Sequence, residues 1–247
     1  EEQIRYSWNY AMLIAEGPSK KALVKSPIYQ AMEEGKIARV EEISRCASEV
    51  QDALISILSE KRLSIPELGE DVAAKKGFSI IATANTRDRG VNEMSAALKR
   101  RFNIVVLPSP ATLEEEVKIV HSRVERLAGS LDLSAKVPDE KVLEKVCTIF
   151  RELRLGETLD GKQKVKSTSN VLSTAEAISL LTNSMSLAGS FGDGEVTDAD
   201  LAAGLQGAII KEDSKDKKVW EEYLENIMKK RGRAWLGLYK ECKALNE

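Results

Sequence analysis

The chain has 247 residues, of which 43% are hydrophobic, enough to bury the core of one large domain or two ordinary ones. Its 37 basic and 39 acidic side chains give a net charge of -2, which excludes bulk attraction to nucleic acid or anionic membrane. Because no run of about 18 apolar residues and no signal-peptide pattern occurs, we expect a cytoplasmic protein without a membrane span. The chain starts at Glu1 rather than at methionine, so we also expect that an upstream portion precedes it.

The thiols and the single imidazole do not suggest catalysis. Cys46, Cys147 and Cys242 are odd in number and widely spaced, which fits neither a disulfide framework nor a zinc site. His121 has no second histidine with which to share a metal ion. We therefore expect reduced, inert cysteines and no histidine base.

The first half of the chain alternates strands with helices. Residues Ile37–Val40, 78–84 and 103–107 are short apolar runs of the kind that forms buried parallel strands. Between the first two runs, residues 47–58 have helical spacing, and residues 63–69 resemble a hairpin that ends in a glycine turn. This order predicts an α/β core with a parallel sheet.

After Pro108 and Pro110, which predict a hinge, the periodicity is helical throughout. Thr112 and Glu115 have capping-box spacing, and Gly156 ends a later helix. The predicted segments are helices 112–127, 138–153, 167–187 and 197–210, a mobile polar loop 157–166, and a long amphipathic segment 215–245. The predicted domains are thus a partial α/β core, residues 1–108, and an all-helical lid with a C-terminal extension, residues 109–247.

Two adjacent carboxylates, Glu41 and Glu42, follow the first apolar strand. Ligands of parallel sheets bind beyond the carboxyl ends of the strands, where acids can hold magnesium and orient a water molecule toward a phosphate. By themselves, two adjacent glutamates are more often a solvated surface pair.

Polar residues also flank the next two strands. Asn85 ends the second strand and can hydrogen-bond a phosphate or a water molecule, although asparagine is equally common at the start of a loop. Arg100 and Arg101 precede the third strand, where a guanidinium can clamp a γ-phosphate or simply occupy a surface turn. Each signal alone is ambiguous.

In their order and spacing, these elements resemble the second half of an AAA+ module of the P-loop NTPase fold. More closely, residues 41–46 (EEISRC) with 49–54 (EVQDAL), then 63–66 (LSIP) and 81–85 (IATAN), resemble the MoxR family. The resemblance extends from about Gly17 through the helical half.

The resemblance implies ATPase activity with ATP and Mg²⁺ at the interfaces of a homo-oligomeric, usually hexameric, ring. It assigns Glu41 to the Walker B position that supports magnesium and Glu42 to the polarisation of the attacking water. It also assigns Asn85 to the first sensor and Arg101 to the arginine finger, with Arg100 as a rival. Asn170 stands at the second-sensor position beside the nucleotide.

The chain also departs from the family pattern. The family has aspartate where Glu41 stands, Arg39 interrupts an apolar strand, and Asn170 replaces an arginine for which Lys164 or Lys166 could substitute. The pattern Gly-x-x-x-x-Gly-Lys-Ser/Thr is absent from these residues, so we expect these 247 residues by themselves to bind nucleotide poorly.

The leading functional hypothesis is a MoxR-like, chaperone-like ATPase that couples hydrolysis to remodelling, assembly or metal insertion of partner proteins. The resemblance suggests partners that carry a von Willebrand factor A domain.

One alternative is a catalytically weakened AAA+ scaffold subunit. Another is a nucleic-acid-binding helical module, based on the basic residues 229–235, although the acidic residues shortly before them favour a solvated helix. Trp8 and Tyr10 suit either a client contact or core packing.

Overall fold

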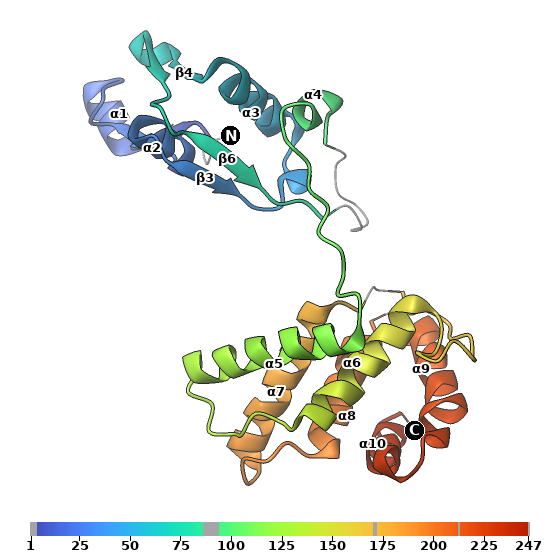
Figure 1. The fold of residues 1–247 in the computed structure, drawn as a ribbon. Coiled ribbons are helices and arrows are strands. Elements are labelled where there is room, and N and C mark those ends of the chain that lie inside the picture. The colour runs from blue at the N-terminus through green and yellow to red at the C-terminus, as the bar shows by residue number, and fades with distance from the viewer. Residues whose placement is uncertain (1–3, 86–93, 170–171, 212, 247) are drawn as a thin grey trace. The chain divides into compact units, whose positions relative to one another are not determined.

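The computed structural model describes residues 4–85, 94–169, 172–211 and 213–246, and it divides into two compact units. The first unit comprises Glu1–Leu107 and the second Pro108–Glu247. Each unit has an apolar core of its own, with strands in the first and helices throughout the second (Figure 1). The two units are therefore described separately.

A pair of parallel strands forms the centre of the first unit. Strand β3 (Ile37–Val40) pairs with β6 (Ser79–Ala82) so that Val40 lies opposite Ala82. Both are strands that the sequence predicts. Because side chains alternate along a strand, Ala38 and Ile80 are buried in the core while Ile37 and Ile81 are exposed. One face of the pair thus carries the core.

Two helices contribute to this core. Helix α2 (Pro27–Glu34) begins after Ser26, whose hydroxyl accepts a hydrogen bond from the Tyr29 amide, and it has proline at its first position. Helix α3 (Ser48–Glu60) follows a short 3-10 turn, η1 (Ile43–Arg45), and buries Leu54 and Ile57. The helix predicted over residues 47–58 is confirmed.

Two glycines meet beside the amino ends of the parallel strands. Gly35 ends α2 in the left-handed conformation with φ of 69°, and Gly77 has φ of 102°. A Cβ atom on Gly35 would lie 2.4 Å from the Lys76 carbonyl oxygen, and one on Gly77 would lie 2.5 Å from the Gly35 carbonyl oxygen. Only glycine fits this approach, which brings the starts of β3 and β6 together.

Two antiparallel pairs complete the strands described in this unit. The predicted hairpin is confirmed as β4 (Arg62–Ile65), the turn η2 (Pro66–Leu68) and β5 (Glu70–Ala73). Strands β1 (Tyr6–Trp8) and β2 (Leu23–Lys25) flank helix α1 (Tyr10–Glu16). Trp8 packs against the core, whereas Tyr10 is 61% exposed, so the two aromatic residues have different environments.

The third predicted strand is not a strand. Residues 103–107 follow the short helix α4 (Ala96–Lys99) without pairing to any strand in the described part of the chain. Ile104, Val105, Val106 and Leu107 are all exposed. A strand needs a neighbour whose backbone groups are free to pair, and an apolar sequence alone does not supply one.

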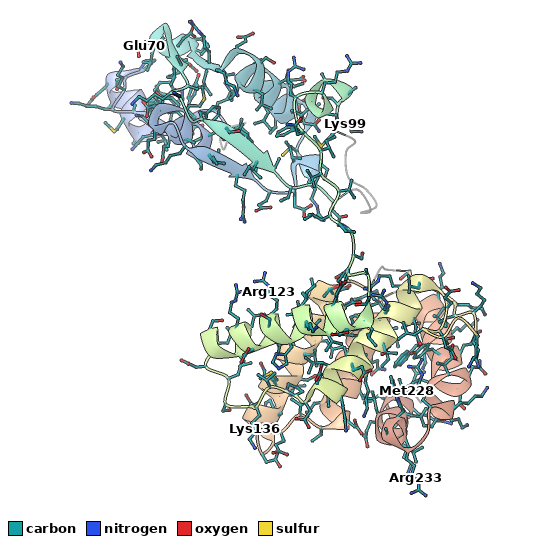
Figure 2. The ribbon with its side chains drawn as sticks, in the orientation of Figure 1. Glu70, Lys99, Arg123, Lys136, Met228 and Arg233 are labelled. Atoms are coloured by element: carbon teal, nitrogen blue, oxygen red, sulfur yellow. The ribbon has the colours of Figure 1, made fainter. Side chains whose placement is uncertain are left out.

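The second unit is helical. Helix α5 (Leu113–Ser130) packs against α6 (Glu140–Leu155) and α7 (Thr174–Phe191), and α7 packs against α8 (Asp198–Ile209). Helix α9 (Asp213–Asn226), the turn η3 (Met228–Lys230) and α10 (Arg233–Ala244) follow. Met228 lies in the interior and Arg233 extends away from the unit (Figure 2).

Local signals set several helix ends. Thr112 with Glu115 and Thr197 with Asp200 form the predicted capping boxes, and Gly156 ends α6 in the left-handed conformation. The prediction that a helix begins at Ser167 is wrong, because α7 begins only after Ser173, whose capping box with Glu176 satisfies the first amides.

One other prediction for this unit needs correction. The polar residues 157–166 form a hydrogen-bonded turn rather than a loose loop, since Glu157 bridges to Lys164 and the Leu159 amide donates to Glu152 at 2.9 Å. The segment 215–245, predicted as long and amphipathic, consists of α9, η3 and α10, and Gly232 adopts a positive φ of 87° before α10. Its Leu238, Tyr239 and Cys242 are buried.

Glu116 joins three helices of the second unit and is fully buried. Its carboxylate accepts hydrogen bonds from Arg154 at 2.7 Å, Thr174 at 2.8 Å and Arg151 at 3.2 Å. Burial by itself would raise the pKa of Glu116, but the bonds from Arg154 and Thr174 outweigh it and leave the pKa lowered. Arg151 also donates to the Pro110 carbonyl at 3.0 Å, which ties the start of the unit to α6.

We expect Glu116→Ala to reduce the free energy of unfolding by roughly 3–5 kcal/mol, because it leaves two largely covered guanidinium groups without a counter-charge. Urea denaturation followed by circular dichroism measures this change. Because the folded pKa is lowered, the stability from Glu116 is present above the ordinary glutamate pKa and is lost as the pH falls through the folded value.

The matched control is Glu114→Ala, which removes an exposed ion pair with Lys118 on the same helix. Such a pair contributes little to stability because water and salt screen its charges. Equal losses in the two variants would contradict the role given to Glu116.

Candidate functional site

The carboxyl ends of β3 and β6 are linked by one hydroxyl group. The Thr83 hydroxyl accepts a hydrogen bond from the Glu42 amide at 3.1 Å and donates one to the Glu41 carboxylate. Backbone pairing also continues past both strands, with Thr83 N donating to Val40 O and Ile43 N donating to Thr83 O, each at 2.9 Å. Both glutamates are thereby held at the edge of the sheet where parallel folds bind ligands.

The Glu41 carboxylate is exposed and ionised. The hydrogen bond from Thr83, followed by the charge of Arg39, lowers the pKa of Glu41 below its usual range despite some desolvation. The Arg39 guanidinium forms an ion pair with the other carboxylate oxygen, Oε1. Both oxygens of Glu41 therefore already have a partner within the chain.

Glu42 has an unusual backbone conformation. Its φ of 53° and ψ of 45° are left-handed, a region that costs a residue other than glycine about 1–2 kcal/mol. Its carboxylate is exposed and lies 3.2 Å from the Arg45 Nε atom. Strain of this kind is concentrated at functional sites, and here it turns the chain directly after the first carboxylate.

The remaining predicted residues of this unit lie around the same strands. Asn85 is exposed two residues beyond Thr83. Arg101 donates to the Ser59 hydroxyl on α3 and, at 2.7 Å, to the Ala97 carbonyl on α4. Arg100 is exposed, and none of the described residues makes a hydrogen bond or ion pair with its side chain. The two arginines therefore differ in their freedom to reach outward.

The residues predicted in the helical unit are only partly described. Asn170 lies outside the described residues. Of its two potential substitutes, Lys164 pairs with Glu157 and Lys166 pairs with Glu222, each at 2.7 Å.

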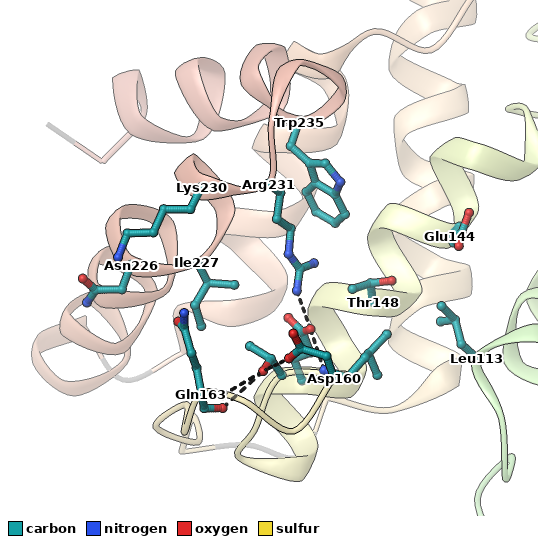
Figure 3. Close-up of a pocket in the computed structure, with 13 residues that line it drawn as sticks. Leu113, Glu144, Thr148, Asp160, Gln163, Asn226, Ile227, Lys230, Arg231 and Trp235 are labelled. Atoms are coloured by element: carbon teal, nitrogen blue, oxygen red, sulfur yellow. Dashed lines mark hydrogen bonds and ion pairs between the residues drawn. The ribbon is translucent and has the colours of Figure 1, made fainter.

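A cavity of about 480 Å³ opens between α6, the turn 157–163 and η3 (Figure 3). Arg231 enters it from η3, pairs with the buried Glu152 and stacks over the Trp235 ring at 4.6 Å. Tyr223 also donates to Glu152, at 2.6 Å, and its pKa is raised by burial. This part of the basic segment 229–235 therefore packs against its own chain, which favours the structural interpretation over nucleic-acid binding.

Within the described ranges, no cluster of three potential ligands that could hold a metal ion occurs, and no helix has the length and apolarity needed to cross a membrane. Mg²⁺ at a phosphate is usually bound through one or two carboxylates with the phosphate and water completing its shell, so an ionised Glu41 fits that role. Cys147 and Cys242 are buried free thiols, and burial raises the pKa of each to about 12, which keeps them unreactive.

Comparison with known proteins identifies the family. A sequence profile described as AAA domain (dynein-related subfamily) matches residues 1–102, and one described as YehL-like AAA+ ATPase C-terminal domain matches residues 114–246, more than half of the chain. The chain belongs to the YehL-like AAA+ ATPases. The predicted fold class is confirmed: an α/β AAA+ core with parallel strands precedes a helical region.

Curated relatives agree with this assignment. YehL of Escherichia coli K12 is 42% identical over 232 residues, which is 91% of this chain and 62% of YehL. YojN of Bacillus subtilis 168 is 28% identical over 138 residues, which is 56% of this chain and 41% of YojN. The chain thus spans less than two thirds of these relatives.

A solved structure is similar over most of the chain but only distantly. NtrX of Brucella abortus in complex with ADP covers 93% of this chain and 52% of its own, with a TM-score of 0.48 and 17% identity. The family assignment therefore rests on the sequence profiles and on YehL.

Thr83 is the site residue that inspection of the sequence missed. It lies inside the predicted strand 78–84, where a β-branched residue is expected for its sheet propensity alone. The available signal was the register: once β3 and β6 pair in parallel with Val40 opposite Ala82, the next residues, Glu41 and Thr83, must be neighbours.

We expect Thr83→Val to raise the pKa of Glu41 toward the ordinary glutamate value, because the substitution removes the hydrogen bond that stabilises the carboxylate. Titration of the side-chain carboxyl by carbon NMR measures this shift. The pKa of Glu114, which Lys118 lowers elsewhere in the chain, serves as the control and stays unchanged. If Glu41 titrates alike in both proteins, Thr83 does not have the role assigned to it.

Proposed function

We propose that these residues form the acidic edge and the helical lid of an ATPase that hydrolyses ATP at subunit interfaces. The observation that carries the proposal is the hydrogen-bonded unit of Glu42, Thr83 and Glu41 at the ends of two parallel strands, with Asn85 two residues further along. Membership of the YehL-like AAA+ family supports the reaction type.

In the proposed mechanism, the ionised Glu41 would hold Mg²⁺, which would supply positive charge to neutralise the phosphates of ATP. Glu42 would hydrogen-bond the attacking water and accept its proton. Asn85 orients the terminal phosphate or the water through its uncharged amide. Asn170 is proposed beside the nucleotide from its sequence position alone.

The chain spans 62% of YehL, so the function of the whole protein is proposed separately. The whole protein is proposed to be a MoxR-like remodelling ATPase. Its subunits would assemble into a homo-oligomeric, hexameric ring, since a finger arginine acts across an interface. Its clients would be partner proteins, including those with a von Willebrand factor A domain, that are assembled or loaded with metal. The family resemblance in residues 41–85 supports this finer assignment.

A second candidate is a scaffold subunit that hydrolyses slowly. The ion pair between Arg39 and the Oε1 atom of Glu41 favours it, because a guanidinium at this oxygen competes with magnesium for the same charge. Arg39 stands on a strand that is otherwise apolar.

Substitution of Glu42 by glutamine is expected to reduce steady-state ATP hydrolysis by the full-length protein about 10²- to 10⁴-fold, the usual contribution of a general base. Glu49→Gln, at an exposed position on α3, is the control and leaves the rate unchanged. If Glu42→Gln hydrolyses ATP as fast as the parent, the catalytic assignment fails.

The same assay separates the two candidates. A parent protein with little activity whose rate increases in the Arg39→Ile variant is a restrained ATPase, and the ion pair with Glu41 is the restraint. A parent that is already fast and is unaffected by Arg39→Ile is the remodelling enzyme of the first candidate.

The geometry favours a division of roles between the two arginines. Arg101, which the resemblance assigns as the finger, is bound to Ser59 and Ala97 of its own chain, whereas Arg100 is exposed and uncommitted among the described residues. We therefore assign the reach toward a neighbouring subunit to Arg100 and the positioning of α4 against α3 to Arg101.

Arg100→Ala is expected to lower kcat by about 10³-fold or more, the scale of an arginine finger, without changing thermal stability. In contrast to Arg100→Ala, the Arg101→Ala variant is expected to have a lower thermal stability, because it loses the contacts between α3 and α4. Mixing parent subunits with Arg100→Ala subunits tests action across the interface. A large loss of kcat in Arg101→Ala alone would reverse the assignment.

A further inference from the structure

A second cavity of the helical unit has a strongly basic lining. It measures about 600 Å³ and lies between the segment that follows the 157–164 turn and helix α9. Three lysines, one hydroxyl, one apolar side chain and one carboxylate line it: Lys166, Ser167, Lys215, Lys218, Val219 and Glu222. Three ammonium groups thus face a single carboxylate in a chain whose net charge is -2.

Most of this positive charge has no counter-charge in the described part of the chain. Lys166 pairs with Glu222 at 2.7 Å. Lys215 and Lys218 make no ion pair or hydrogen bond through their side chains with any described residue, and both are exposed. Because ammonium groups around one cavity repel each other, an anion bound among them would lower the electrostatic energy.

Hydrogen bonds to the Asp216 carboxylate join the two walls of the cavity. Asp216, fully buried on α9, accepts hydrogen bonds from the Ser169 amide at 2.7 Å, the Ser169 hydroxyl at 2.6 Å and the Lys211 amide at 3.1 Å. These bonds fasten the segment that carries Lys166 and Ser167 to α9, and Figure 1 shows this segment beside that helix. The backbone segments from which the lysines extend are therefore joined by contacts within the chain.

The spacing of the helix residues suits a compact anion. Lys215 and Lys218 are three residues apart, so they lie on the same face of α9. Val219, which is buried, provides an apolar base beside them. Ammonium groups are compact point charges that donate up to three hydrogen bonds each, and a serine hydroxyl adds a directional donor, which together match a phosphate group.

We propose that this cavity binds a phosphate-bearing anion, with Lys215 and Lys218 as its principal contacts and Lys166 and Ser167 as supporting ones. All its residues belong to the helical unit, and the proposal does not depend on hydrolysis at the acidic edge of β3 and β6. The anion comes either from the phosphates of a nucleotide or from an inorganic polyphosphate, two sources that share the same chemistry.

The test uses isothermal titration of the full chain with inorganic tripolyphosphate at low ionic strength. We expect binding that weakens as salt is added, because exposed charges are screened. The double variant Lys215→Gln/Lys218→Gln is expected to bind about tenfold more weakly, since two exposed charge contacts are lost. Glu222→Gln is expected to bind more tightly, because it removes the carboxylate from the lining.

The control is Lys217→Gln/Lys240→Gln, which changes the net charge equally at positions outside the cavity lining and should bind like the parent. Circular dichroism confirms that each variant is folded. Absence of binding by the parent, or equal losses in the two double variants, would overturn the proposal.

Competition identifies the source of the anion. If ATP displaces tripolyphosphate and Lys215→Gln/Lys218→Gln weakens ATP binding, the site accepts nucleotide phosphates. If ATP does not compete, it accepts inorganic polyphosphate. If Glu42→Gln hydrolyses ATP as fast as the parent while tripolyphosphate binding is retained, the catalytic assignment fails and this inference stands, so the two proposals can fail independently.

Discussion

The candidate site depends on one side chain, the hydroxyl of Thr83. It accepts from the Glu42 amide and donates to the Glu41 carboxylate, so one oxygen atom connects both acids to the neighbouring strand. Without it, neither glutamate would have a side-chain hydrogen bond to the end of β6. With it, the first acid has a lowered pKa and the chain is held in a left-handed turn at the second. The order of the site is therefore a consequence of parallel strand pairing.

The same edge also contains a competing interaction. Arg39 extends from the strand and forms an ion pair with Glu41, so the acid proposed to support magnesium already has a cation beside it. A solvated arginine that is screened by salt is displaced more easily than a buried one. A cation bound at Glu41 would therefore have to compete with Arg39.

In the helical unit, buried carboxylates connect the elements that contribute their hydrogen-bond and ion-pair partners. Glu116 connects α5, α6 and α7, Glu152 connects α6 to Tyr223 and Arg231, and Asp216 fastens a loop to α9. Each buried carboxylate is satisfied by guanidinium, hydroxyl or amide donors, because an unpaired charge in this core would cost several kcal/mol. The basic cavity beside Asp216 is a product of this arrangement.

Sequence alone determined the features that arise from local chemistry. The strands around Ala38 and Ile80, the hairpin turning at Gly69, the capping boxes at Thr112 and Thr197 and the end of α6 at Gly156 follow from alternation, glycine conformation and short-range hydrogen bonds. The order of Glu41, Glu42 and Asn85 along the chain also suggested the AAA+ class, which the family profiles bear out.

Only the tertiary structure decided the contacts between residues far apart in the chain. The partnership of Thr83 with Glu41, the anchoring of Arg101 by Ser59 and the pairing of Glu152 with Arg231 join residues separated by more than 40 positions, and no periodicity encodes them. The exposed segment 103–107 shows the converse, since an apolar run becomes a strand only where a neighbouring backbone is free to pair. Local propensity selects the elements, and packing selects which side chains meet.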